Sequence, residues 1–187
     1  MARKKKTQTV AVASTNDIKY RGEVTVQKMR GGKVVGKQRF HNKGYSQLFI
    51  FLLNCLKGAF RVDDRPMYCF ACKKDVTSNS YFPLSTIPAT VGTSDIQVNT
   101  AATTPNVTYR FYLPYNNNYK DNALNALMLF SKNGYDTIKS GLSTTAPLLT
   151  DYCSMAVDFD NGIPVEADTD LLIIWTLYVT NGGTTNE

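Results

Sequence analysis

The chain has 187 residues, 43% of them apolar, and a formal net charge of +6. This length suits one domain rather than several, and the apolar content is that of a globular protein with a sizeable core. The charge is uneven, because residues 1–74 hold 17 basic and 4 acidic side chains whereas the remainder holds 4 and 11. A basic half and an acidic half favour head-to-tail contacts between copies or binding to a polyanion.

A basic tail opens the chain. The apolar stretch 10–13 behind it is too short for the core of a secretory signal, so we expect no signal peptide and four reduced cysteines in a cytoplasm. We predict that residues 1–17 form a flexible tail, residues 18–180 a single β-sandwich domain and residues 181–187 a flexible C-terminus. The tail's candidate contacts with nucleic acid or a protein partner are Arg3, Lys4, Lys5 and Lys6.

The next segment predicts a β-hairpin. Residues 23–28 and 33–40 carry β-branched side chains and flank Gly31 and Gly32. A glycine pair adopts the positive φ that a tight turn needs, so we expect the two segments to pair as antiparallel strands.

A short helix is predicted over residues 45–57. Its apolar side chains recur at three- and four-residue steps, Asn42 is the expected N-cap, and Gly58 is the expected left-handed C-cap. The apolar run 48–53 falls far below the ~20 residues that cross a bilayer, so we expect a helix laid on a sheet.

The rest of the chain favours strands. The final strand is apolar on both faces, so it must lie centrally in its sheet or be covered by a neighbouring subunit. Residues 94–99 are a weaker strand candidate, and residues 123–130 are ambiguous between strand and helix. The clearest strand patterns lie at residues 66–72, 107–115, 153–159 and 171–179.

These elements predict a mainly β protein, a two-sheet antiparallel β-sandwich (jelly-roll-like) with one packed α-helix and long loops or arms. Its helix content should fall well below the average of about a third for globular proteins. The residues expected in the core are Val107, Phe111, Val157, Phe159, Ile173 and Trp175.

Two polar connections, residues 77–106 and 131–150, are long for a compact domain. We predict that the first is an arm that clamps onto the next copy, since backbone hydrogen bonds and buried side chains then offset the entropy lost on ordering. The alternative is a floppy surface loop. The candidate interface residues of the arm are Tyr81, Phe82, Leu84 and Ile87.

Two motifs have metal-site features but fit other roles better. Cys69 and Cys72 have the spacing of a zinc knuckle, but the other two cysteines are isolated and His41 is the only histidine. Residues three apart on a strand face opposite ways, which favours small buried cysteines. Residues 158–162 resemble the start of a calcium loop, yet the glycine falls one position early and the closing glutamate is absent, so an Asn-Gly turn fits better.

Two acidic pairs are candidates for acid–base catalysis. Both pairs, Asp63 with Asp64 and Asp168 with Asp170, sit at predicted strand boundaries, where aspartate is an ordinary turn residue. One histidine leaves little room for a catalytic triad, and the sequence holds neither a glycine-rich phosphate loop nor a nucleophile elbow. We therefore predict a protein without enzymatic activity and without a cofactor.

Short motifs follow one another in a particular order along the chain. After the basic hairpin come Asn42-Lys43-Gly44, Leu56-Lys57-Gly58, Arg65-Pro66-Met67-Tyr68, Ala156-Val157-x-Phe159, Ile163-Pro164-Val165 and Ile174-Trp175-Thr176-Leu177. This order resembles that of small β-sandwich structural proteins of tailed bacteriophage virions. One departure is that Ala126 to Met128 replace the acidic residue and the glycine usual in the corresponding segment of that family.

The resemblance implies a non-enzymatic structural subunit of a tailed bacteriophage virion, with phages of the crAss-like kind as the expected source. Such a subunit is a head fibre, a capsid decoration protein or a ring component of the neck or tail. It is made in the bacterial cytoplasm, assembles as a homo-oligomer and contacts other virion proteins of the capsid, portal or tail, but no membrane. The basic first half keeps one alternative open, a nucleic-acid-binding accessory protein that contacts the packaged genome.

Overall fold

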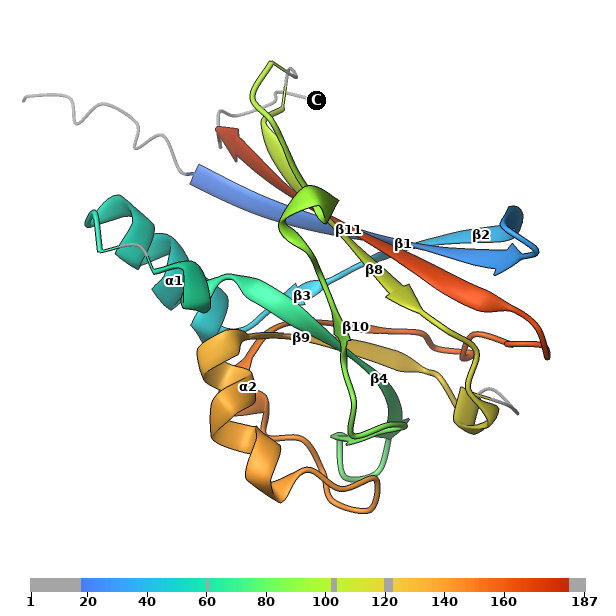
Figure 1. Cartoon of the computed structure of the whole chain (residues 1–187). Helices are drawn as coiled ribbons and strands as arrows, with labels where there is room; N and C mark the ends of the chain where they lie inside the picture. Colours follow the sequence, from blue (N-terminus) through green and yellow to red (C-terminus); the bar gives the residue numbers. More distant parts are fainter. Residues whose placement is uncertain (1–17, 60, 102–103, 120–122, 182–187) are drawn as a thin grey trace, which may run out of the picture.

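Two antiparallel sheets pack face to face, and the helices gather at one side of them (Figure 1). This computed structural model describes residues 18–59, 61–101, 104–119 and 123–181. The structure is 46% strand and 21% helical, which confirms the predicted mainly β sandwich with a packed helix. The predicted tails, and with them Arg3, Lys4, Lys5 and Lys6, lie outside the described residues, apart from Asn181.

The first sheet, called sheet A below, carries both ends of the described chain. Its strand order is β2-β1-β11-β8-β7, and every neighbouring pair is antiparallel. The central strand β11 is the final strand of the chain, as its apolar faces predicted. The bounds are β1 (Ile18–Arg30), β2 (Lys33–His41), β7 (Ile96–Asn99), β8 (Asn106–Leu113) and β11 (Asp170–Asn181).

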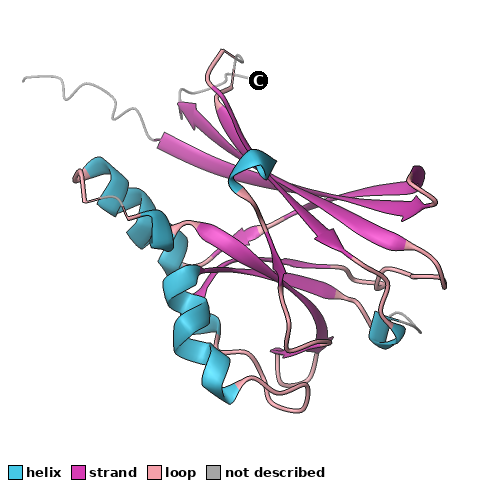
Figure 2. Ribbon diagram, viewed as in Figure 1, coloured by secondary structure: helices cyan, strands magenta, loops and turns pink. Residues whose placement is uncertain are grey.

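The second sheet, sheet B, lies below sheet A in the view of Figure 2. Its order is β3-β10-β9-β4-β5, and the short strand β6 also pairs with β4. The ambiguous apolar run near residue 126 is therefore a strand, β9. The bounds are β3 (Lys43–Gly44), β4 (Pro66–Asp75), β5 (Ser80–Pro83), β6 (Ala89–Thr90), β9 (Ala126–Ser131) and β10 (Cys153–Asp158).

The predicted hairpin is confirmed. Strands β1 and β2 pair around Gly31 and Gly32, whose φ angles are 56° and 75°. Backbone of this kind favours glycine, because a β-carbon would clash there. The register shifts by a bulge between Lys28 and Met29.

The first helix, α1 (Ser46–Leu56), confirms the predicted helix but not its N-cap. The N-cap is Tyr45 rather than Asn42, because the Asn42 amide donates to the Gly22 carbonyl at 3.3 Å and the next two residues form β3. The chain leaves the sheet only at Tyr45. At the other end Gly58 has φ 74°, and its amide donates to Cys55, as a left-handed C-cap requires.

A second helix, α2 (Lys132–Ile138), corrects the prediction of a single helix. Its sequence is poor in helix-forming residues, so the sequence pattern did not predict a helix there. The helix forms because the Ser131 hydroxyl caps it, accepting from the Gly134 amide at 3.1 Å, and because Ile138 is buried against sheet B. The 3₁₀ turns are η1 (Val62–Asp64), η2 (Thr93–Asp95), η3 (Asn117–Tyr119), η4 (Lys139–Gly141) and η5 (Thr150–Tyr152).

The main core fills the space between the sheets. Five of the six predicted core residues are buried there, and Val107 is partly buried against them. The five buried residues are Phe111, Val157, Phe159, Ile173 and Trp175.

A second apolar cluster covers the opposite face of sheet B. Phe70, Met128 and Phe130 point away from sheet A and pack under Ile138 of α2 and Leu148 of the following loop. Sheet B is therefore buried on both faces. The outward side chains of sheet A, by contrast, join neither cluster of the described residues.

We expect truncation in the main core to be costly. Leu127→Ala and Ile173→Ala should each lower the free energy of unfolding by about 2–5 kcal/mol, because both side chains are fully buried and leave a cavity. Urea unfolding followed by tryptophan fluorescence measures the change. Leu149→Ala, at a side chain that is 56% exposed, should change the free energy of unfolding by no more than about 0.5 kcal/mol. Equal effects at all three positions would contradict the core assignment.

Candidate functional site

The cysteine pair lies inside the fold. Cys69 is buried in the main core and Cys72 in the second cluster, so the two thiols face opposite sides of β4 as their spacing predicted. Burial raises the pKa of both thiols, which keeps them protonated. Cys153 is also buried, and Cys55 is exposed on α1. No group of three or more metal-ligating side chains gathers within the described ranges.

The two predicted acidic pairs hold turns in place. Asp64 accepts from the Asn133 side-chain amide at 2.6 Å and so joins η1 to α2. Asp170 accepts from the Tyr115 amide at 2.8 Å and from the Tyr112 hydroxyl. Asp168 is exposed with φ 62°, a turn conformation. These carboxylates are not brought together in one site.

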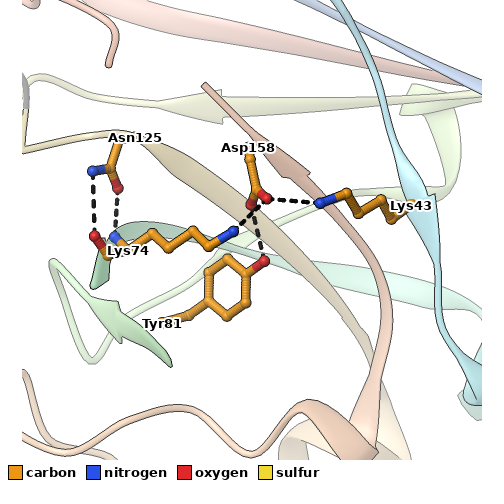
Figure 3. Close-up of polar contacts among 5 residues, drawn as sticks. All are labelled: Lys43, Lys74, Tyr81, Asn125 and Asp158. Carbon is orange, nitrogen blue, oxygen red and sulfur yellow. Dashed lines mark hydrogen bonds and ion pairs between the residues drawn. The ribbon is translucent and has the colours of Figure 1, made fainter. Parts of the chain in front are cut away.

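Asp158, the first residue of the calcium-loop-like segment, is the centre of a polar cluster whose partners no sequence motif indicated (Figure 3). One carboxylate oxygen accepts from the Lys74 ammonium at 2.7 Å and from the Lys43 ammonium at 3.0 Å, and the other accepts from the Tyr81 hydroxyl at 2.9 Å. Asn125 bonds the backbone of Lys74 beside them. The cluster therefore ties β3, β4, β5 and β10 together at one end of sheet B.

The charge balance in this cluster favours the ionised carboxylate. Partial burial raises the pKa of Asp158, but hydrogen bonds from Lys74, Lys43 and Tyr81 outweigh that effect and hold the pKa below its usual value. Burial and the bond to Asp158 also raise the pKa of Tyr81, which stays protonated. Both oxygens of Asp158 thus accept hydrogen bonds from side chains of other strands, which gives the cluster a structural role.

We expect the Asp158 cluster to make stability depend on pH. Because the folded pKa lies below the unfolded value of ~3.9, its contribution is full above that value and is lost as the pH falls through the folded pKa. Asp158→Asn should therefore be less stable than the wild type at neutral pH and show a shallower loss of stability below about pH 5. Urea unfolding at several pH values tests this, and parallel curves for the two proteins would contradict it.

The two lysines of the cluster should differ in importance. The Lys74 side chain is 18% exposed, whereas that of Lys43 is 67% exposed. Lys74→Met leaves the largely buried Asp158 carboxylate with fewer donors, so it should lower the free energy of unfolding by on the order of 1–3 kcal/mol. Lys43→Met should lower it by less than about 1 kcal/mol. Unfolding of the two variants under one buffer condition compares them. A larger loss for Lys43→Met would refute this order.

Open clefts of different volume occur on the described surface. One, of about 400 Å³, lies on the inner side of the hairpin and is lined by Lys28, Arg30 and Gln38, with Glu166 already paired to Arg30. Another, of about 240 Å³, lies between α1 and α2. Neither holds the neighbouring acid and base that hydrolytic chemistry needs.

The outward side of α1 carries four of the twelve large apolar side chains that are exposed among the described residues. Phe49, Leu53 and Leu56 follow one another at steps of four and three residues and so share one face, and Ile50 borders it where α1 lines the cleft toward α2. Their exposed fractions run from 47% for Ile50 to 79% for Leu56. We call these four residues the apolar face of α1.

The helix is apolar on its other side as well. Leu48 is fully buried, and Phe51 and Leu52 pack against the main core where α1 contacts β10. No charged residue occurs between Ser46 and Leu56. The periodic pattern predicted Leu48 and Leu52, which are buried or packed against the core, but it equally included Phe49, Leu53 and Leu56, which are exposed.

The predicted arm folds back onto its own domain. Strands β5 and β6 extend sheet B, and β7 extends sheet A. Among the four predicted interface residues, Tyr81 is buried under α2 with its hydroxyl on Asp158, while Phe82 and Leu84 are partly buried. Ile87 is 81% exposed. The four residues therefore do not form one surface, and the contact of the arm with a next copy stays a prediction.

Comparison with known proteins gives no relative for this chain. It matches no protein-family model, no curated protein and no solved structure. Within the described residues, no helix has the length and apolar character to cross a membrane.

Proposed function

We propose that the protein is a non-enzymatic structural subunit that works as a homo-oligomer and joins its copies through the apolar face of α1. The observation that carries this proposal is that face itself, with Phe49, Ile50, Leu53 and Leu56 exposed on a helix without charges. Exposed apolar patches of this kind mark sites of association, and the cores of such interfaces are depleted of charged residues.

Burial of the apolar face of α1 can offset the free-energy cost of pairing two copies. Full burial of a large apolar side chain stabilises by roughly 1.5–3 kcal/mol, and association costs about 4–15 kcal/mol in lost freedom. One copy contributes four partly exposed side chains, which barely offset that cost. A two-fold contact uses the same face from both copies and so doubles the buried apolar surface. We therefore expect the α1 contact to be self-complementary.

The setting that we propose is a tailed bacteriophage virion. The support is the order of motifs along the chain, which resembles that of small β-sandwich structural proteins of such virions. In this setting the protein is made in the bacterial cytoplasm and contacts capsid, portal or tail components besides its own copies. The exposed Ile87 of the arm is the residue that we propose for contacts beyond the first pair.

The apolar face of α1 is testable by charge insertion. Leu53→Glu combined with Leu56→Glu should convert the wild-type oligomer to a monomer at micromolar concentration, because both carboxylates would be desolvated in the contact. Size-exclusion chromatography with light scattering gives the mass.

A matched control distinguishes the α1 contact from a general effect of charge. Val76→Glu combined with Leu149→Glu adds the same charges at two other exposed apolar side chains and should keep the oligomer. A wild-type protein that is monomeric at all concentrations, or equal loss in both double variants, would reject α1 as the contact. Ile87→Glu should leave the first pair intact and reduce only larger assemblies.

A further inference from the structure

The outer face of sheet A has an unusual composition for an uncovered sheet surface. Since Val24 on β1 and Ile173 and Trp175 on β11 point into the main core, their immediate neighbours point outward. The neighbours Leu172 and Ile174 are therefore apolar residues on the outward side, and both are only partly buried.

Strand register places these apolar residues between cations. One row across four strands reads Arg39, Thr25, Ile174 and Arg110, and the next reads Lys37, Gln27, Leu172 and Tyr112. Adjacent strands lie ~4.8 Å apart, so Arg39 and Arg110 flank the apolar centre at a separation of about 14 Å.

The positive charge on this face is largely uncompensated. The acidic side chains on the outward side of these strands, among the described residues, are Glu23, which pairs with Arg21 at 2.7 Å, and Asp170, which accepts from the Tyr112 hydroxyl. Lys37, Arg39 and Arg110 form no ion pair with any described residue. Three free cations around an apolar strip attract an anion that also has an apolar surface.

Two tyrosines complete the face. Tyr112 is 55% exposed on β8, and its hydroxyl is held by Asp170. Tyr178 lies on β11 with the Arg21 guanidinium 5.0 Å from its ring centroid. Both rings are fixed by these contacts, which makes them rigid platforms for stacking.

We propose that the outer face of sheet A binds single-stranded nucleic acid. Arg39, Lys37 and Arg110 contact phosphates, while bases lie over Leu172, Ile174 and Tyr112. Sequence-tolerant binding of single strands combines a basic surface with aromatic platforms in this way. A duplex would offer its phosphates but keep its base faces stacked inside, leaving the apolar strip without a partner. This inference goes beyond the proposed assembly function and uses a different surface, since α1 packs against sheet B.

The test is fluorescence anisotropy with a labelled oligothymidine of about 20 nucleotides and with a duplex of the same length. The wild type should bind the single strand more tightly than the duplex, with an affinity that falls as salt rises. Arg39→Glu combined with Arg110→Glu should weaken binding at least about tenfold and make the slope of log affinity against log salt shallower by about 1.4. Tyr112→Ala should weaken binding about fivefold or more without changing that slope.

A matched variant controls for net charge. Arg61→Glu combined with Lys73→Glu changes the charge equally at exposed positions outside sheet A and should bind within about twofold of the wild type. Circular dichroism checks that every variant is folded. Should the Glu pair not fold, Arg39→Gln with Arg110→Gln replaces it, with the slope again shallower by about 1.4.

Several results would overturn the proposal. They are no single-strand binding at low salt, equal weakening by the two Glu pairs, and loss of binding only when Arg3, Lys4, Lys5 and Lys6 are replaced by Ala. If Arg39→Glu with Arg110→Glu changes the mass of the oligomer but not the affinity for nucleic acid, the outer face of sheet A instead binds an acidic surface of a second copy. Since the α1 variants report on mass and the sheet A variants on affinity, failure of this inference is distinguishable from failure of the assembly proposal.

Discussion

The pairing of β1 with β11 is the contact on which the rest of the molecule depends. It runs from Ile18 opposite Asn181 to Met29 opposite Asp170, and so it joins the two ends of the described chain. Bringing β1 and β11 together closes a long loop, and the entropy cost of loop closure grows only slowly with loop length. The pairing also places the fully buried Trp175 in the core. All other described strands lie between β1 and β11 in the sequence. Folds built on such distant contacts form more slowly than helical domains.

The parts of the fold that follow local rules were predictable. The Gly31-Gly32 turn and the Gly58 cap each require positive φ, and the structure has it at all three glycines. The parts that depend on distant neighbours were not predictable. Helix α2 exists because Gly134 permits a close approach, since a β-carbon there would come within 2.7 Å of the Tyr152 carbonyl oxygen. Nothing in the local sequence reports that neighbour.

The candidate surfaces show the same limit. The sequence of α1 predicted an apolar helix, but periodicity alone does not say which apolar side neighbours cover. The sheet A face unites Arg39 and Arg110, which lie far apart in the chain and meet only through the β2-β1-β11-β8 register. The Asp158 cluster likewise draws its partners from three other strands. Tertiary pairing, rather than any motif, creates these sites.

Because Ile18 pairs with Asn181, the first and last described residues lie side by side. Paired residues on antiparallel strands lie only ~4.5–5.5 Å apart at their α-carbons, so Ile18 and Asn181 lie at the same corner of sheet A. Joining the ends with a short linker and reopening the chain at the exposed Gly31-Gly32 turn would preserve every strand, so this architecture lends itself to circular permutation.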